Sequence, residues 1–149
     1  MWNKDKSLAL SIWCVRLFTV IMVAVWFLAP SLFSHLIQLR EEYLAGALPF
    51  FLASTYTASV PAAAALWLLH GLLSSIAAGK VFIPQNVRRL RGLSWCCILA
   101  GLICLASACY YLPFLLLATA AAFVGLILRV VKNVLEQAVA IKTENDYTI

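Results

Sequence analysis

The feature that most constrains the fold is a long apolar stretch near the N-terminus, over residues 8–33, which only Arg16 interrupts. At about 1.5 Å of rise per residue, a helix of this length exceeds the roughly 30 Å hydrocarbon core of a bilayer. The chain therefore has to cross a membrane, and we expect a single all-α, polytopic membrane domain over residues 1–149 with four transmembrane helices. The four predicted spans are residues 8–33, 59–78, 93–112 and 114–131.

Composition supports a lipid environment. Hydrophobic residues make up 64% of the 149 residues and charged residues only 11%. A small globule in water must cover a large surface with polar groups, which this chain lacks. These values exclude a soluble enzyme, a disordered tail, a disulfide-stapled secreted domain and a nucleic-acid-binding domain. The formal net charge of +5 then indicates contact with lipid and no direct contact with nucleic acid.

The apolar region before the second predicted span is too long for one simple crossing. Counting back from Lys80 places the span at residues 59–78 and makes Pro61 a proline of the first helical turn. Residues 47–58 then either extend this helix outward or lie at the membrane interface. The sequence leaves both alternatives open.

Lysine and arginine residues set the expected orientation. They gather at the N-terminus, in the loop at residues 80–92 and in the tail at residues 132–149, whereas the first outer loop has only Arg40. The positive-inside rule then places both termini, the loop and the tail in the cytoplasm. A cleaved signal peptide is disfavoured, because the first apolar run is too long and lacks a small-residue cleavage site.

No pattern of catalytic residues occurs in the sequence. We find no nucleophile with a neighbouring base, phosphate-binding glycine loop or HExxH motif, and we expect no enzyme, cofactor or metal. Every acidic residue lies outside the spans, which argues against an ion-coupled carrier. The polar groups expected inside the membrane are Arg16, which should snorkel to the headgroups, and His70, which should bond to a neighbouring helix.

Cysteines and other small residues favour close helix packing. Four of the five cysteines lie in the third predicted span without a CxxC pair, so we interpret them as packing residues. Small residues also recur at four-residue spacing, as in Ala121 and Gly125. Such stripes serve packing within one chain or between the protomers of a homo-oligomer, and the pattern does not separate the two.

The two predicted cytoplasmic segments carry most of the informative polar residues. The basic loop either rests on anionic lipid or forms a docking surface. In the tail, Val134, Ala138 and Ile141 recur at helical spacing, so the fourth helix should continue into water. An Asn-Asp turn signal followed by Thr148 and Ile149 favours an extended end that could add to a sheet edge or fill a groove.

Gly79-Lys80-Val81-Phe82, then Asn86-Val87 and Leu90-Arg91, and the closing Lys142-Thr143-Glu144-Asn145-Asp146-Tyr147-Thr148-Ile149 carry a resemblance. In these segments the chain resembles the YoaS-like family of bacterial four-span membrane proteins, which is classed as a domain of unknown function. The resemblance implies a small helix-turn-helix regulator as a partner, and it implies no catalytic residues.

With this resemblance, the sequence favours a regulatory or docking platform in a bacterial inner membrane. The alternatives are a small permease, channel or immunity-type protein that acts within the bilayer through Arg16, His70 and the region of Tyr56, or a structural subunit of a larger complex. The expected docking residues are Phe82, Asn86, Arg88, Arg91, Glu144, Asn145, Asp146, Thr148 and Ile149.

Overall fold

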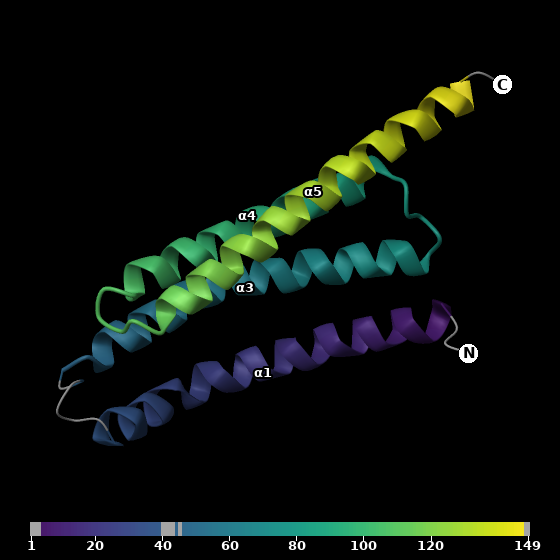
Figure 1. Cartoon of the computed structure of the whole chain (residues 1–149). Helices are drawn as coiled ribbons and strands as arrows, with labels where there is room; N and C mark the ends of the chain where they lie inside the picture. The colour runs from purple at the N-terminus through teal and green to yellow at the C-terminus, as the bar shows by residue number, and fades with distance from the viewer. Residues whose placement is uncertain (1–3, 40–43, 45, 148–149) are drawn as a thin grey trace.

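In a computed structural model, the chain forms four long helices that run back and forth in an antiparallel bundle (Figure 1). The structure describes residues 4–39, 44 and 46–147, without the side chains of residues 4, 5 and 146. Each helix is long and apolar enough to cross a membrane, and no strand occurs in the described residues. The predicted all-α fold with four transmembrane helices is confirmed. The helices are α1 (Lys4–Leu39), α3 (Leu48–Ala77), α4 (Pro84–Ser107) and α5 (Phe114–Tyr147).

Helix boundaries differ from the predicted spans in instructive ways. Helix α3 begins at Leu48, so residues 47–58 extend the helix outward and do not form a separate interfacial segment. Pro49, and not Pro61, is the proline of its first turn, where a missing N–H costs no helical hydrogen bond. Pro61 lies inside the helix, which corrects the expectation from sequence. Helix α4 begins at Pro84, within the predicted loop at residues 80–92, and ends at Ser107.

A Schellman motif ends helix α3 and starts the connection to α4. The N–H of Gly79 donates to the carbonyl of Ile76 (3.0 Å), and the N–H of Lys80 donates to the carbonyl of Ser75 (2.9 Å). Gly79 has a φ of 72°, a left-handed conformation that glycine adopts without a Cβ clash. This turn fixes the direction in which the chain enters α4.

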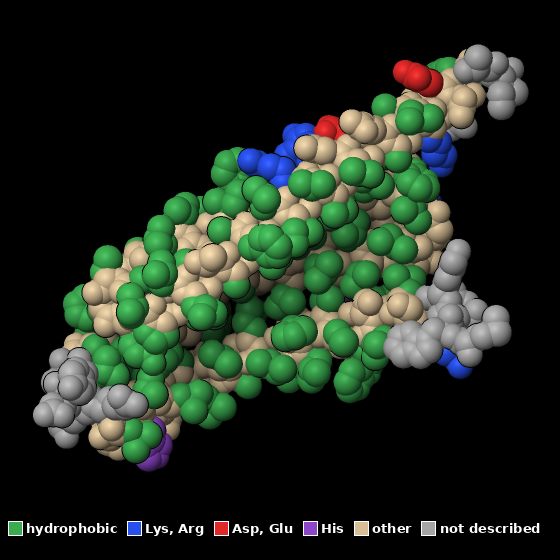
Figure 2. Space-filling view, viewed as in Figure 1, with side chains coloured by type: hydrophobic (Ala, Val, Ile, Leu, Met, Phe, Trp, Pro, Cys, Tyr) green, Lys and Arg blue, Asp and Glu red, His purple; other side chains and the backbone are tan. Residues whose placement is uncertain are grey.

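Each helix packs mainly against the next one along the chain: α1 on α3, α3 on α4, and α4 on α5. Figure 2 shows a hollow between α1 and α5 on the face that is drawn. Part of the interior is a cavity of about 340 Å³ to which all four helices contribute, with Trp26, Ser59, Cys104 and Leu117 among the lining residues.

An aromatic cluster closes the end of the bundle at the α4–α5 turn. Phe51 is 1% exposed and contacts the rings of Phe33, Tyr110, Tyr111 and Phe114, at centroid distances of 5.1 to 6.0 Å. We call this the aromatic end. Tyrosine rings favour the headgroup level of a bilayer, so this end of the bundle is suited to a membrane interface.

Small residues bring α4 and α5 into close contact. Ser94 donates from its hydroxyl to the carbonyl of Gly125 (2.9 Å). A Cβ added at Gly101 would lie 3.3 Å from the carbonyl oxygen of Ala118. A Cβ added at Gly125 would lie 3.3 Å from the Cβ of Cys97, so this cysteine serves packing within the chain.

Candidate functional site at the charged end of the bundle

Charged side chains gather at the end of the bundle opposite the aromatic end, and Figure 2 shows several of them over α4 and α5. Contacts between helices set them at one level. A Cβ added at Gly92 would lie 2.7 Å from Leu68, and Arg129 lies over the ring of Trp95, with its Cζ 5.4 Å from the centroid. We call this group the charged collar, and its members are Arg88, Arg89, Arg91, Arg129, Lys132 and Glu136.

His70 lies at the level of the charged collar. A Cβ added at the next residue, Gly71, would lie 3.1 Å from Nε of Arg89, which places His70 at this level. Its side chain is exposed. The predicted place of His70 inside the membrane and its predicted bond to a neighbouring helix stay predictions.

Arg16 lies near the level of the charged collar. The contacts of Trp26 with Tyr56 and of Phe33 with Phe51 fix an antiparallel register between α1 and α3. Ten residues before Trp26, that register brings Arg16 to about the level of Trp67. The Arg16 side chain is exposed. Snorkelling toward the headgroups needs only a short reach from this level.

A buried hydrogen-bond network holds the α3–α4 connection. The side chain of Asn86 is 0% exposed and donates from Nδ2 to the carbonyls of Lys80 (2.8 Å) and Val81 (3.0 Å). Its Oδ1 accepts from Nη1 of Arg89 (3.1 Å), and Arg89 also donates to the hydroxyl of Ser75. Asn86 was expected to dock a partner. That expectation is wrong, because its side chain is enclosed and its hydrogen bonds are all used to shape the turn.

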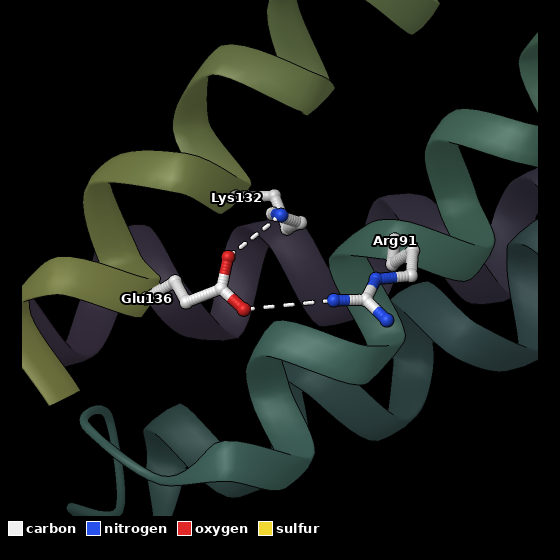
Figure 3. A network of polar contacts seen from close by, with 3 residues as sticks. All are labelled: Arg91, Lys132 and Glu136. Carbon is white, nitrogen blue, oxygen red and sulfur yellow. Dashed lines mark ion pairs between the residues drawn. The ribbon is translucent and has the colours of Figure 1, made fainter. Parts of the chain in front are cut away.

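A second polar network joins α4 to α5 (Figure 3). Glu136 accepts from Lys132, one helical turn earlier, at 2.7 Å and forms an ion pair with Arg91 at 3.5 Å. The hydrogen bond from Lys132 and its positive charge, with a smaller effect of Arg91, hold the pKa of the Glu136 carboxyl below its ordinary value. Arg91, an expected docking residue, is thus engaged in a contact between helices.

The connection and the tail meet in a shallow groove. It has a volume of about 490 Å³ and is lined by Phe82 from the connection and by Ala138, Ile141, Lys142 and Asn145 from α5. Phe82 is 47% exposed and Ile141 is 61% exposed. Two of the expected docking residues, Phe82 and Asn145, therefore lie side by side although they are far apart in sequence. We call this the Phe82 groove.

The other expected docking residues are more scattered. Arg88 is exposed on α4 and lines a different groove, between α3 and α4. Glu144 is exposed on α5, next in sequence to Asn145 of the Phe82 groove. Helix α5 continues through Asn145 and Asp146 to Tyr147, so the predicted turn there does not form. Thr148 and Ile149, with their predicted extended conformation, lie outside the described residues, as does the side chain of Asp146.

Several contacts at the charged end of the bundle were not predicted from the sequence. Arg89 and Ser75 bind each other across helices, and no local pattern signals such a contact. The i, i+4 spacing of Lys132 and Glu136 was a usable signal for an ion pair. Among the described residues, no group of three or more His, Cys, Asp or Glu side chains could hold a metal ion.

The fold and its charged end define a small multi-pass membrane protein. Residues 6–149 match the family model described as protein of unknown function, DUF2975, and the chain belongs to this family. The match confirms the expected membership of a family of unknown function, whereas the YoaS-like designation stays a prediction. Searches among curated proteins and solved structures gave no match.

Proposed function

We propose that this protein is a membrane-anchored docking platform that binds a cytoplasmic protein at the Phe82 groove. The observation that carries the proposal is the Phe82 groove itself, which Phe82 and the α5 tail line together as one largely apolar surface from two separate segments. The helix continues past Arg129 to Tyr147 for about 27 Å at its rise per residue, so this surface projects beyond the collar (Figure 1).

Exposed apolar residues on this projecting part support a partner. Ile141 is 61% exposed and Tyr147 is 87% exposed. Beyond the bilayer these side chains meet water, where a partner's apolar surface would stabilise them. An amphipathic helix that contributes i, i+3 and i+7 anchors is a common recognition element. Our proposed partner is a small helix-turn-helix regulator, as the family resemblance implies.

The proposal includes an orientation. Both termini and the α3–α4 connection face the cytoplasm of a bacterial inner membrane, since basic residues gather at this end. Figure 1 shows the described parts nearest the N- and C-termini and this connection at the same end of the bundle. A cytoplasm-dependent reporter fused after Ile149 should be active, and the same reporter inserted at Leu112 should be inactive. The reverse pattern would contradict the orientation.

The docking test uses a photoreactive residue at position 141 in the full chain in its native host membrane. We expect a crosslink to one soluble protein, and this crosslink should be lost on changing Phe82→Ser. The matched control is Val134→Ser, which changes an exposed aliphatic residue of α5 that does not line the groove. Equal crosslinking in the Phe82→Ser and Val134→Ser variants would overturn the proposed groove.

A second candidate function is a small permease or channel, which the four-helix cavity favours. Its lining includes the hydroxyl-bearing residues Ser54, Thr55, Ser59 and Ser107 among apolar side chains. The hydroxyl oxygens of Ser54 on α3 and Ser107 on α4 form a hydrogen bond of 2.7 Å. Potassium or proton flux in liposomes that disappears on changing Thr55→Leu would support a pore. Flux absent from the parent chain would exclude this candidate for these ions.

A further inference from the structure

A large groove lies between α3 and the first turns of α4, whereas the Glu136 ion pair with Arg91 joins α4 to α5. It has a volume of about 1180 Å³ and is formed by the last third of α3, the α3–α4 connection and the first turns of α4. It is open along one side. The lining residues that the argument uses are Trp67, His70, Lys80, Ile83, Arg88 and Arg89.

The groove is positively charged without compensation. Lys80, Arg88 and Arg89 line it, and none of its lining residues is acidic. Among the described residues, no carboxylate forms an ion pair with any of these three side chains. The smaller pocket between α4 and α5 also has three cationic lining residues, but Glu136 pairs with two of them. Of these two pockets, the one on the α3 side therefore offers an anion more cationic side chains without a carboxylate partner among the described residues.

One of the three cations is already held in place. Arg89 donates to Ser75 and to Asn86, and its guanidinium packs over Gly71. This fixed geometry spares the ligand the entropic cost of ordering that side chain. Arg88 and Lys80 are exposed and able to adjust around a phosphate.

The groove also has an apolar wall. Trp67 is 76% exposed and lies near the level at which Leu68 meets Gly92, on the membrane side of the collar. Indole rings settle at the headgroup level of a bilayer. A ligand that fits here has an anionic phosphate on the collar side and a hydrocarbon chain on the Trp67 side, which a free phosphate lacks.

We propose that this groove is a binding site for an anionic phospholipid. The phosphate would accept hydrogen bonds from Arg88, Arg89 and Lys80, and an acyl chain would lie along Trp67 and Leu68. Basic pockets between transmembrane helices recognise anionic headgroups by the same chemistry. The site is separate from the Phe82 groove, so it stands or falls independently of partner docking.

The test compares lipid retention by the full chain in mild detergent, with phosphatidylglycerol and phosphatidylcholine as the probes and native mass spectrometry as the measurement. We expect retention of phosphatidylglycerol over phosphatidylcholine. The Lys80→Gln, Arg88→Gln double variant should bind phosphatidylglycerol about 10- to 30-fold more weakly. The matched control is Lys142→Gln, which removes an exposed cation from the Phe82 groove and should leave binding unchanged.

Two further arms make the outcome decisive. Trp67→Ala should weaken phosphatidylglycerol binding, and millimolar inorganic phosphate should not displace the lipid. Displacement by inorganic phosphate, with Trp67→Ala unchanged, would identify a soluble phosphate site and overturn the lipid assignment. Equal phosphatidylglycerol binding by the parent and the double variant would overturn the site itself. Matching circular dichroism and melting curves for these variants verify that each one folds.

Discussion

Gly71 lies directly beneath the guanidinium of Arg89, so that a Cβ at Gly71 would lie 3.1 Å from Nε and 3.3 Å from Cζ. The absence of a side chain on α3 thus lets an arginine of α4 cross that helix and reach Ser75. This relationship couples the end of α3 to the first turns of α4, and it also fixes one wall of the proposed lipid groove.

Replacing Gly71 with leucine should displace Arg89 and break its hydrogen bonds to Ser75 and Asn86. We expect the free energy of unfolding in mild detergent to fall by about 1–3 kcal/mol, the usual cost of unmaking buried polar contacts. Ser74→Leu is the control, because Ser74 is exposed on the same helix. In a double-mutant cycle with Arg89→Met, the two changes should be strongly non-additive. Additive losses would contradict the coupling.

Asn86→Ala should destabilise the α3–α4 connection. The change leaves the carbonyls of Lys80 and Val81 without the donors that they now have. We expect a loss of about 1–3 kcal/mol in unfolding free energy, measured by thermal or denaturant unfolding in detergent. The neighbouring Gln85→Ala variant, at an exposed position, should stay within about 0.5 kcal/mol of the parent. Equal stability of both variants would refute a structural role for Asn86.

Gly101→Leu should push α5 away from α4. A Cβ at Gly101 already falls 3.3 Å from the backbone oxygen of Ala118, and backbone yields less readily than a flexible side chain. We expect destabilisation of about 1–3 kcal/mol from overpacking. The same substitution at Ala106, which is exposed on α4, serves as the control. If Gly101→Leu melted at the same temperature as Ala106→Leu, the tight α4–α5 contact would be wrong.

The lowered pKa of Glu136 predicts how its contribution to stability depends on pH. Its pKa is lowered in the folded chain, chiefly by Lys132, so its contribution is present above its ordinary pKa and is lost as the pH falls through the lowered one. A small difference in melting temperature between the parent and Glu136→Gln should exist at neutral pH and shrink as the pH falls below the ordinary pKa of a glutamate carboxyl. High salt should also shrink it, because the carboxyl is exposed. A difference that grows in acid would contradict the sign.

The sequence predicts much of this fold because lipid simplifies the problem. Any apolar run of sufficient length must become a helix that satisfies its own backbone hydrogen bonds. The helical spacing of Val134, Ala138 and Ile141 likewise predicted that the fourth helix continues past the membrane, and α5 does continue. Helix number, class and the helical tail follow from these local patterns.

Helix bounds and buried contacts were harder to predict. Hydropathy indicates where the bilayer lies, whereas helix ends depend on turns, so α4 begins at Pro84 well before the apolar residues start. The burial of Asn86 depends on a carbonyl geometry that only the folded connection creates. Its position among Arg88, Arg89 and Arg91 suggested a solvent-facing surface. Phe82 and Asn145 line one groove only because of the register among three helices. No short-range pattern in the sequence encodes that register.

The continuity of α5 has a mechanical consequence. The helix has 34 residues, which is about 51 Å at its rise per residue, and it contains no proline. Its first residue, Phe114, is packed in the aromatic cluster, and its last described residue, Tyr147, projects past the collar. A movement of the exposed tail is therefore carried along one uninterrupted helix to the aromatic end, where Phe51 and Tyr111 pack against Phe114.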